Sequence, residues 1–200
     1  VRETHCPTSF DALDAARRFS PRRPVTLLLR SDLAPASLDT LLEVFRDNAH
    51  AKLPGFRGEE GGNVVDLGAN EGYYTLAMKL RNPAVRVVAA EALHENVDLL
   101  RRNMEANGIE GVDSFECAVS ESVGHVEIET YPHVGTIAAI GIARFYRPWI
   151  DPSRIQRRTV DSTTLPGLLE RAELPSGEIL KLDIEGSEVA ALSADPSAVR

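Results

Sequence analysis

Short apolar runs alternate with helical periodicities along the chain from residue 63 onward. Residues 63–67 predict a first strand, and apolar residues at helical spacing then predict a helix, namely Tyr73, Leu76, Ala77 and Leu80. Residues 85–90 are rich in β-branched side chains and predict a second strand. Repeated β-α units of this kind are typical of an α/β fold built around a parallel sheet.

The same alternation continues toward the carboxyl end. A second helix is predicted to stop at Asn107-Gly108, because both residue types tolerate a left-handed backbone, and its apolar face is formed by Val97, Leu100 and Met104. Residues 113–119 predict a third strand, residues 124–130 an added strand and residues 178–184 a fourth strand. A short helix is expected from Ser187, and another before the fourth strand from Leu165, Leu168, Leu169 and Ala172. The aromatic-rich segment after the added strand follows no clear pattern.

The first part of the chain predicts a mainly helical extension and linker over residues 1–62, followed by one domain over residues 63–200. The clearest helix of the extension has an apolar face of Leu38, Leu41, Leu42 and Phe45. Residues 52–62 are rich in glycine and predict the connecting loop.

Composition narrows the class of protein. With 200 residues, 43% hydrophobic and 26% charged, the chain has the composition of an ordinary soluble domain. A net charge of −8 argues against a nucleic-acid partner, which requires a basic surface. No apolar run is long enough to span a membrane and no secretory pattern opens the sequence, so we expect a cytoplasmic protein without a membrane partner. Cys6 and Cys117 fit no metal spacing and are expected to be reduced, and a homo-oligomer is compatible with the sequence.

The strongest chemical signal is the segment of residues 64–72, an apolar strand that runs into a tight turn and then a helix. Gly68 and Gly72 lack a Cβ, so the backbone can turn sharply and approach a ligand, and Asn70 stands where a left-handed conformation is needed. The turn therefore predicts a ligand-binding loop, with a simple tight strand-to-helix connection as the alternative.

Glu91 ends the second strand, where a carboxylate can accept hydrogen bonds from both hydroxyls of a ribose. Dinucleotide enzymes share this feature, but they place a pyrophosphate on the glycine-rich turn. Here Asp66 precedes the turn and Glu71 lies within it, and negative charge disfavours pyrophosphate. The same negative charge favours a cationic sulfonium compound that carries an ammonium group.

At this point the sequence resembles the FkbM family of methyltransferases over residues 63–192. The matching motifs are Val65-Asp66-Leu67-Gly68-Ala69-Asn70-Glu71-Gly72, then Ala90-Glu91-Ala92 with Asn96, Leu100, Asn103 and Asn107, then Ala118-Val119-Ser120, Val160-Asp161-Ser162 and Lys181-Leu182-Asp183-Ile184-Glu185-Gly186-Ser187-Glu188. Departures are Ala92, where the family has proline, and Gly135-Thr136-Ile137-Ala138, which lacks the expected serines.

The resemblance implies a doubly wound, mostly parallel Rossmann-like methyltransferase sheet. Because the sequence ends at Arg200, we expect the sheet to lack its last strands. The implied methyl donor is S-adenosylmethionine, with S-adenosylhomocysteine as the product. The resemblance implies that Asp66, Gly68, Asn70 and Gly72 contact the methionine part of the donor. It also implies that Glu91 contacts the ribose and that the Cys117-Ala118 backbone contacts the adenine. Ala69 and Ala92 are the remaining implied donor-binding residues.

Lys181, Asp183 and Glu185 alternate along the predicted fourth strand and so are expected on one face, opposite Leu180, Leu182 and Ile184. Ligands of open α/β sheets bind beyond the carboxyl ends of the strands. Asp183 and Glu185 are therefore the predicted catalytic residues, which orient or deprotonate the acceptor, and Asp183 is also a predicted donor contact. A divalent metal ion between the two acids is the less favoured alternative, because no histidine ligand accompanies them, and no metal-binding residue is assigned.

The function that follows is methyl transfer to a hydroxyl of a small molecule, sugar or natural product, which would place the protein in natural product biosynthesis. N-methylation stays open. The alternatives are a non-catalytic cofactor-binding or scaffold module with a methyltransferase fold, and a nicotinamide-linked oxidoreductase. His94, His125 and His133 are each expected at the surface, and His133 is the candidate base if any histidine acts as one.

Overall fold

Four parallel strands form the centre of the molecule. The computed structural model describes residues 25–30, 34–46, 62–131, 138–139, 151–174 and 179–193. The strands β1 (Asn63–Leu67), β2 (Arg86–Glu91), β3 (Val112–Glu116) and β8 (Ile179–Leu182) pair in the order β3-β2-β1-β8. Their apolar runs are nearly continuous because both faces of the sheet are covered, so that Val64 packs into one core and Val65 into another.

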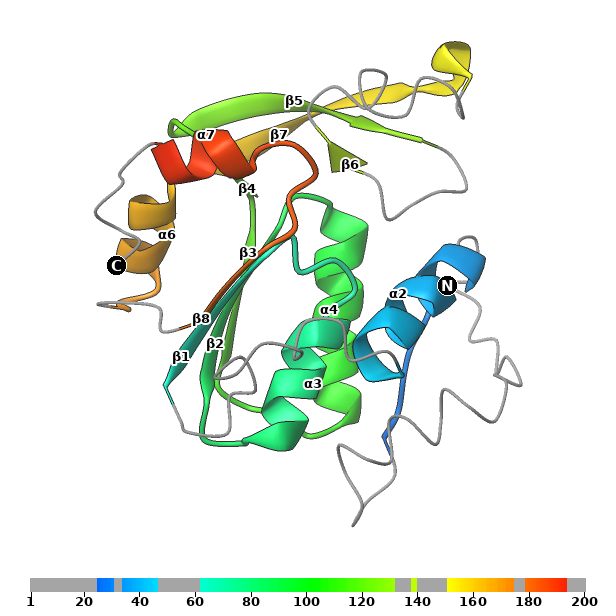
Figure 1. The fold of residues 1–200 in the computed structure, drawn as a ribbon, viewed down its shortest axis with the longest axis vertical. Helices are drawn as coiled ribbons and strands as arrows, with labels where there is room; N and C mark the ends of the chain where they lie inside the picture. Colours follow the sequence, from blue (N-terminus) through cyan, green and yellow to red (C-terminus); the bar gives the residue numbers. More distant parts are fainter. Residues whose placement is uncertain are drawn as a thin grey trace.

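Helices cover both faces, as the sequence predicts for a doubly wound α/β fold. On one face lie α3 (Tyr73–Arg81) and α4 (His94–Ala106), and on the other α6 (Leu165–Arg171) and α7 (Glu188–Ser193) (Figure 1). Helix α4 ends as expected near Gly108, which has a φ of 59°, whereas Asn107 keeps a negative φ of −105°. The helices cover the two faces of the sheet but not the carboxyl ends of its strands, which is where a ligand site can form.

The described part of the amino-terminal extension packs against this domain. Helix α2 (Ala34–Phe45) contributes Leu41 and Phe45 to the same core as Tyr73. Residues 25–30 run beside α4, and two asparagines of that region hold their backbone. Asn103 Oδ1 accepts from Leu28 N at 2.8 Å, and Asn107 Oδ1 accepts from Thr26 N at 2.9 Å. The extension and the sheet thus share one core.

A second sheet lies over the carboxyl ends of the first (Figure 1). Its strands are β4 (Ala118–Val119), β5 (Gly124–Thr130), β6 (Ala138–Ala139) and β7 (Gln156–Thr163), in the order β4-β7-β5-β6. Strand β5 is the predicted added strand, but β7, its antiparallel partner, is not predicted by the sequence pattern. Ahead of β7, residues Pro152–Arg154 form a 3-10 turn.

Three predicted boundaries are wrong. The single strand expected over residues 113–119 is two strands in two sheets, because the chain leaves β2 after the bond from Cys117 N to Glu91 O and then pairs with β7. Strand β8 ends at Leu182 rather than at residue 184, and the helix expected from Ser187 begins at Glu188.

The predicted loop over residues 52–61, the aromatic segment with His133, and residues 194–200 lie outside the described residues. Within the described ranges, none of the helices has the length and apolarity needed to cross a membrane.

Candidate functional site

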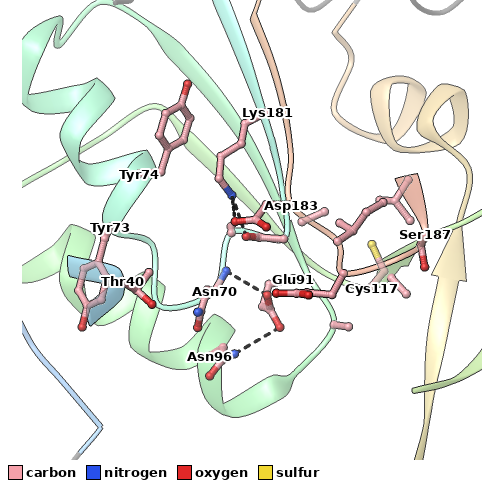
Figure 2. Close-up of a pocket in the computed structure, with 18 of the residues that line it drawn as sticks. Thr40, Asn70, Tyr73, Tyr74, Glu91, Asn96, Cys117, Lys181, Asp183 and Ser187 are labelled. Atoms are coloured by element: carbon pink, nitrogen blue, oxygen red, sulfur yellow. Dashed lines mark hydrogen bonds and ion pairs between the residues drawn. The ribbon is translucent and has the colours of Figure 1, made fainter. Parts of the chain in front are cut away.

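A cavity of about 230 Å³ opens where β1, β2 and β8 end, beneath the second sheet and beside α2. Its lining comes from six parts of the chain (Figure 2). The lining residues include Thr40, Glu43, Asn70, Glu91, Cys117, Ala118, Ile128, Lys181, Asp183, Glu185 and Ser187. This is the position at which open α/β sheets bind ligands.

The turn between β1 and α3, residues 68–72, is the predicted ligand-binding loop, here named the donor loop after its predicted ligand. Gly68 and Asn70 have positive φ values of 74° and 50°, as expected. The amides of Gly68 and Ala69 donate to Ala90 O at 2.9 and 3.0 Å, which ties the loop to the end of β2. A Cβ on Gly68 would lie 1.9 Å from Asp183 O, so glycine is needed there for the close approach of the chain that follows β8.

Glu91 joins the donor loop to α4. Its Oε2 accepts from Asn70 N at 2.9 Å, and its Oε1 accepts from Leu93 N at 2.9 Å and from Asn96 Nδ2 at 3.4 Å (Figure 2). Burial raises the pKa of Glu91, and these hydrogen bonds oppose the rise only in part. Carboxylate oxygens have several lone-pair sites, so Glu91 can still accept bonds from a ligand in the cavity.

Asn70 contributes an acceptor that the described residues do not satisfy. Its Oδ1 is buried and has no hydrogen-bond partner among them. A buried acceptor without a donor is costly, and natural proteins leave few of them. Asn70 lines the cavity, so a ligand that donates a hydrogen bond would complete the contacts of its side chain.

Lys181 lies at the centre of the charged side of the cavity. Its Nζ is 3.1 Å from Asp66 Oδ1, 3.1 Å from Gly68 O and 3.6 Å from Asp183 Oδ2. It also stands 5.7 Å above the ring of Tyr74. Burial disfavours the charged ammonium, but the two carboxylates outweigh burial and raise the pKa of Lys181, so it is a cation at neutral pH.

Two predicted donor contacts lie outside the cavity lining. Asp66 is fully buried, and its carboxylate accepts from Thr75 Oγ1 at 2.7 Å and pairs with Lys181. Gly72 packs on α4, since a Cβ there would lie 2.6 Å from Leu100 Cγ. Asp66 thus fixes Lys181, and Gly72 lets α3 and α4 approach one another.

The Glu71 carboxylate, which was expected to face the ligand of the turn, lies outside the cavity lining as well. Its carboxylate is buried against α2, where it accepts from Ser37 Oγ at 2.5 Å and from Tyr73 Oη at 2.5 Å. Burial and this carboxylate raise the pKa of Tyr73. Among the described residues, the negative charge in the cavity comes instead from Glu43, Glu91, Asp183 and Glu185, with Lys181 as the opposing cation.

Asp183 and Glu185 both line the cavity, but not as alternating residues of a strand. They follow β8 in a turn, where Glu185 has a φ of 50° and the Asp183 side chain is 57% exposed. Glu188 holds this turn by accepting from Ile184 N at 3.2 Å and Gly186 N at 2.9 Å. The turn brings both predicted catalytic carboxylates into the lining of the cavity.

The opposite side of the cavity is apolar. Cys117 and Ala118, the predicted adenine contacts, line it together with Val119 and Ile128. Cys117 is 3% exposed and its thiol is free; burial raises the pKa of that thiol. A flat aromatic group would find an apolar surface here.

Sequence reasoning missed the contributions of α2 and Asn96. Thr40, Glu43 and Val44 line the cavity from α2, although the spacing of Leu38, Leu41 and Phe45 signals only a packing face. Asn96 has no predicted role, yet it lines the cavity and its Nδ2 donates to Glu91 Oε1 at 3.4 Å. Two of the histidines expected at the surface, His94 and His125, lie there. Their side chains are 73% and 69% exposed and pair with Glu116 and Asp161 respectively. The described residues contain no group of three or more histidine, cysteine or acidic side chains that could hold a metal ion.

Comparison with known proteins places this geometry in a family. Two curated relatives are methyltransferase sdnD of Sordaria araneosa, 32% identical over 46% of this chain and 35% of that protein, and methyltransferase 1 of Beauveria bassiana, 27% identical over 63% and 55%. This chain therefore spans between about a third and about half of those relatives.

Among solved structures, the chain is similar to geranyl diphosphate C-methyltransferase from Streptomyces coelicolor, a complex with Mg²⁺, geranyl diphosphate and S-adenosyl-L-homocysteine. The identity is 18% and the TM-score 0.33, over 56% of this chain and 48% of that one. The model of the methyltransferase FkbM domain matches residues 66–200, which is more than half of the chain. The chain therefore belongs to the FkbM methyltransferase family.

Proposed function

We propose that this chain binds S-adenosylmethionine in the cavity and transfers its methyl group to a hydroxyl of a small molecule, sugar or natural product. The observation that carries the proposal is the buried Asn70 Oδ1, an acceptor without a partner in the described structure, beside the Glu91 carboxylate. A ligand rich in hydrogen-bond donors suits both groups, and S-adenosylmethionine carries an ammonium and two ribose hydroxyls.

The electrostatics of the lining support a cationic ligand. Glu43, Glu91, Asp183 and Glu185 line the cavity, and Lys181 is the cationic residue among the lining residues that the structure describes. Lys181 is itself paired with Asp66 and Asp183, so its charge is largely compensated. Because the described lining holds more carboxylates than cationic side chains, it favours a sulfonium and an ammonium over the pyrophosphate of a dinucleotide.

Each part of the lining then has a role toward the donor. Asn70 and the backbone of Gly68 and Ala69 would hold the amino-acid end, and Glu91 the ribose hydroxyls. The apolar side with Cys117 and Ala118 would hold the adenine, and Ala92 borders the ribose. When bound, the donor supplies an electrophilic methyl carbon that is already activated by its sulfonium.

The chain's own task in the reaction is to align the acceptor and to remove its proton. Asp183 and Glu185 both line the cavity, and the Asp183 side chain is exposed to the solvent from which an acceptor enters. We assign Asp183 to accept or orient the hydroxyl proton, with Glu185 next to it in the same turn. The ion pair with Lys181 fixes the direction of the Asp183 side chain.

Calorimetric titration with S-adenosylmethionine and with S-adenosylhomocysteine tests the donor, and a screen of hydroxylated and aminated small molecules tests the acceptor. We expect both donor ligands to bind with one-to-one stoichiometry and methylation of a hydroxyl. Failure of both ligands to bind would overturn the proposal. Donor binding without methylation of any acceptor would favour a non-catalytic cofactor-binding module, and methylation of amines alone would replace O- by N-methyl transfer.

A further inference from the structure

Helix α2 contributes polar side chains to the cavity although it precedes the matched family region, which begins at residue 66. Thr40, Glu43 and Val44 line the cavity from this helix. Glu43 is exposed and carries a carboxylate, while Val44 is buried in the core. Thr40 Oγ1 donates to Ala36 O at 3.2 Å, so the lone pairs of this hydroxyl stay available to accept a bond.

The helix is fixed directly to the donor loop. Ser37 Oγ donates to Glu71 Oε1 at 2.5 Å, and both side chains are buried. Tyr73 Oη lies 2.5 Å from Glu71 Oε2 and 3.0 Å from Leu28 O. Asn103 Nδ2 donates to Glu71 O at 2.9 Å, which adds α4 to the same network. A shift of α2 would therefore disturb the loop that holds the donor.

The position of α2 relative to the other lining residues shows which end of a bound donor it faces. In Figure 2, Thr40 lies on the side of Glu91 that holds Asn70, and Cys117 and Ser187 lie on the other side. If Glu91 grips the ribose and the Cys117 side holds the adenine, the α2 side is left for the methionine part. Opposite charges attract at short range, so a carboxylate there favours the ammonium of that part.

We propose that α2 forms the wall that recognises the amino-acid end of the methyl donor, with the Glu43 carboxylate and the Thr40 hydroxyl as its contacts. This inference rests on the proposed donor, S-adenosylmethionine. Asn70 Oδ1 faces the same end from the donor loop, so the ammonium is met from two sides. Ser37, through Glu71, is a positioning residue that fixes the helix.

The test compares two ligands that share adenine, ribose and sulfur, S-adenosylhomocysteine and 5′-methylthioadenosine, which lacks the amino-acid part. The variant Thr40→Val with Glu43→Gln keeps the shape of both side chains. We expect it to bind S-adenosylhomocysteine about three- to tenfold more weakly, the loss typical of an exposed charge contact and a hydrogen bond, and to bind methylthioadenosine as the parent does.

Two control variants make the result specific. Asp39→Asn removes a charge from the exposed side of α2 outside the cavity lining, and should leave both affinities unchanged. Glu91→Gln should weaken both ligands, because both carry the ribose. Thermal unfolding of every variant checks that each is folded under the titration conditions.

The outcomes separate this inference from the proposed function. If the α2 variant loses affinity for both ligands equally, or for neither, α2 does not read the amino-acid end and the inference is overturned. If the parent chain binds neither ligand, the donor itself is wrong and both proposals fall. A selective loss for S-adenosylhomocysteine in the α2 variant alone supports the inference.

Discussion

Lys181 Nζ lies 3.1 Å from Asp66 Oδ1, and this ion pair joins the interiors of β8 and β1 beneath the donor loop. The side chains are 7% and 0% exposed. A buried charge without its partner is strongly unfavourable, so neither residue can be removed alone without cost. The same ammonium bonds to Gly68 O, which links the stability of the sheet to the position of the donor loop.

Lys181→Met should destabilise the fold by about 3–5 kcal/mol, because it leaves the Asp66 carboxylate buried and uncompensated. Denaturation with urea measures the change in free energy of unfolding. The double variant with Asp66→Asn should recover part of the loss, since no charge is left unpaired. A Lys181→Met protein as stable as its parent would contradict the assignment of this pair.

The pH dependence of the same pair has a defined sign. The pKa of Lys181 is raised in the folded protein from its ordinary value of 10.5, so the ammonium contributes stability that is fully present below that value. This contribution is lost only as the pH rises through the higher folded pKa. The advantage of the parent over Lys181→Met should therefore persist to about pH 10 and shrink above it.

Asn70→Gly tests the acceptor in the donor loop. Glycine keeps the backbone with its φ of 50° and removes Oδ1. We expect affinity for S-adenosylhomocysteine to fall about three- to tenfold, which corresponds to one lost hydrogen bond, and stability to change by less than about 1 kcal/mol. Calorimetry and thermal unfolding check the two values, and unaltered affinity would remove Asn70 from the site.

Glu91 should make donor binding sensitive to acid. Burial raises the pKa of Glu91 above its ordinary value of 4.5, so acidification protonates this carboxyl sooner than an ordinary glutamate. A protonated carboxyl accepts hydrogen bonds from ribose hydroxyls less well, so affinity for S-adenosylhomocysteine should fall as the pH drops through the raised pKa. In Glu91→Gln the affinity should be lower and nearly independent of pH in that range.

The free energy of unfolding should rise, while donor affinity falls, as acidification protonates Glu91. Between the raised pKa and 4.5 the folded state binds the proton on Glu91 and the unfolded state does not, so lowering the pH through this window favours folding at this site. The difference in unfolding free energy between parent and Glu91→Gln isolates this effect from other carboxyls. A difference that moves the other way on acidification would contradict the raised pKa.

Asp183→Asn and Glu185→Gln separate proton removal from donor binding. If Asp183 accepts the acceptor's proton, Asp183→Asn should lower kcat about a hundredfold or more, the usual contribution of a general base. Glu185→Gln should have the smaller effect on kcat, and neither should abolish binding of S-adenosylhomocysteine. Unchanged kcat in both variants would exclude the two carboxylates as the base.

The sequence predicts the central sheet well because burial on both faces leaves a direct mark on it. Short apolar runs rich in β-branched residues, as in β1 and β2, are typical of strands buried on both faces, and the left-handed positions at Gly68 and Asn70 follow from residue type. Strand β7 escapes prediction because it is largely exposed and rich in charge, so it shows no apolar run. Exposed strands are set by cross-strand pairs, which a single sequence does not reveal.

The candidate site is predictable where a residue stands at the end of a strand or in the turn that follows it. Glu91 and Asp183 reach the cavity because they stand at strand ends. The destinations of Asp66 and Glu71 depend on partners far away in the chain, Lys181 and Ser37, which no local pattern identifies. The role of α2 was hidden for the same reason, since its apolar spacing predicts packing and says nothing about its cavity-facing polar residues.

The central claim is that the cavity around Asn70 and Glu91 is the binding site of S-adenosylmethionine. Titration of the parent chain and of Glu91→Gln with S-adenosylhomocysteine at pH 7.5 tests it most directly. We expect saturable one-to-one binding by the parent and binding at least tenfold weaker by Glu91→Gln with its fold intact, because a charged hydrogen bond is lost. Equal affinity of the two proteins, or no binding by the parent, would contradict it.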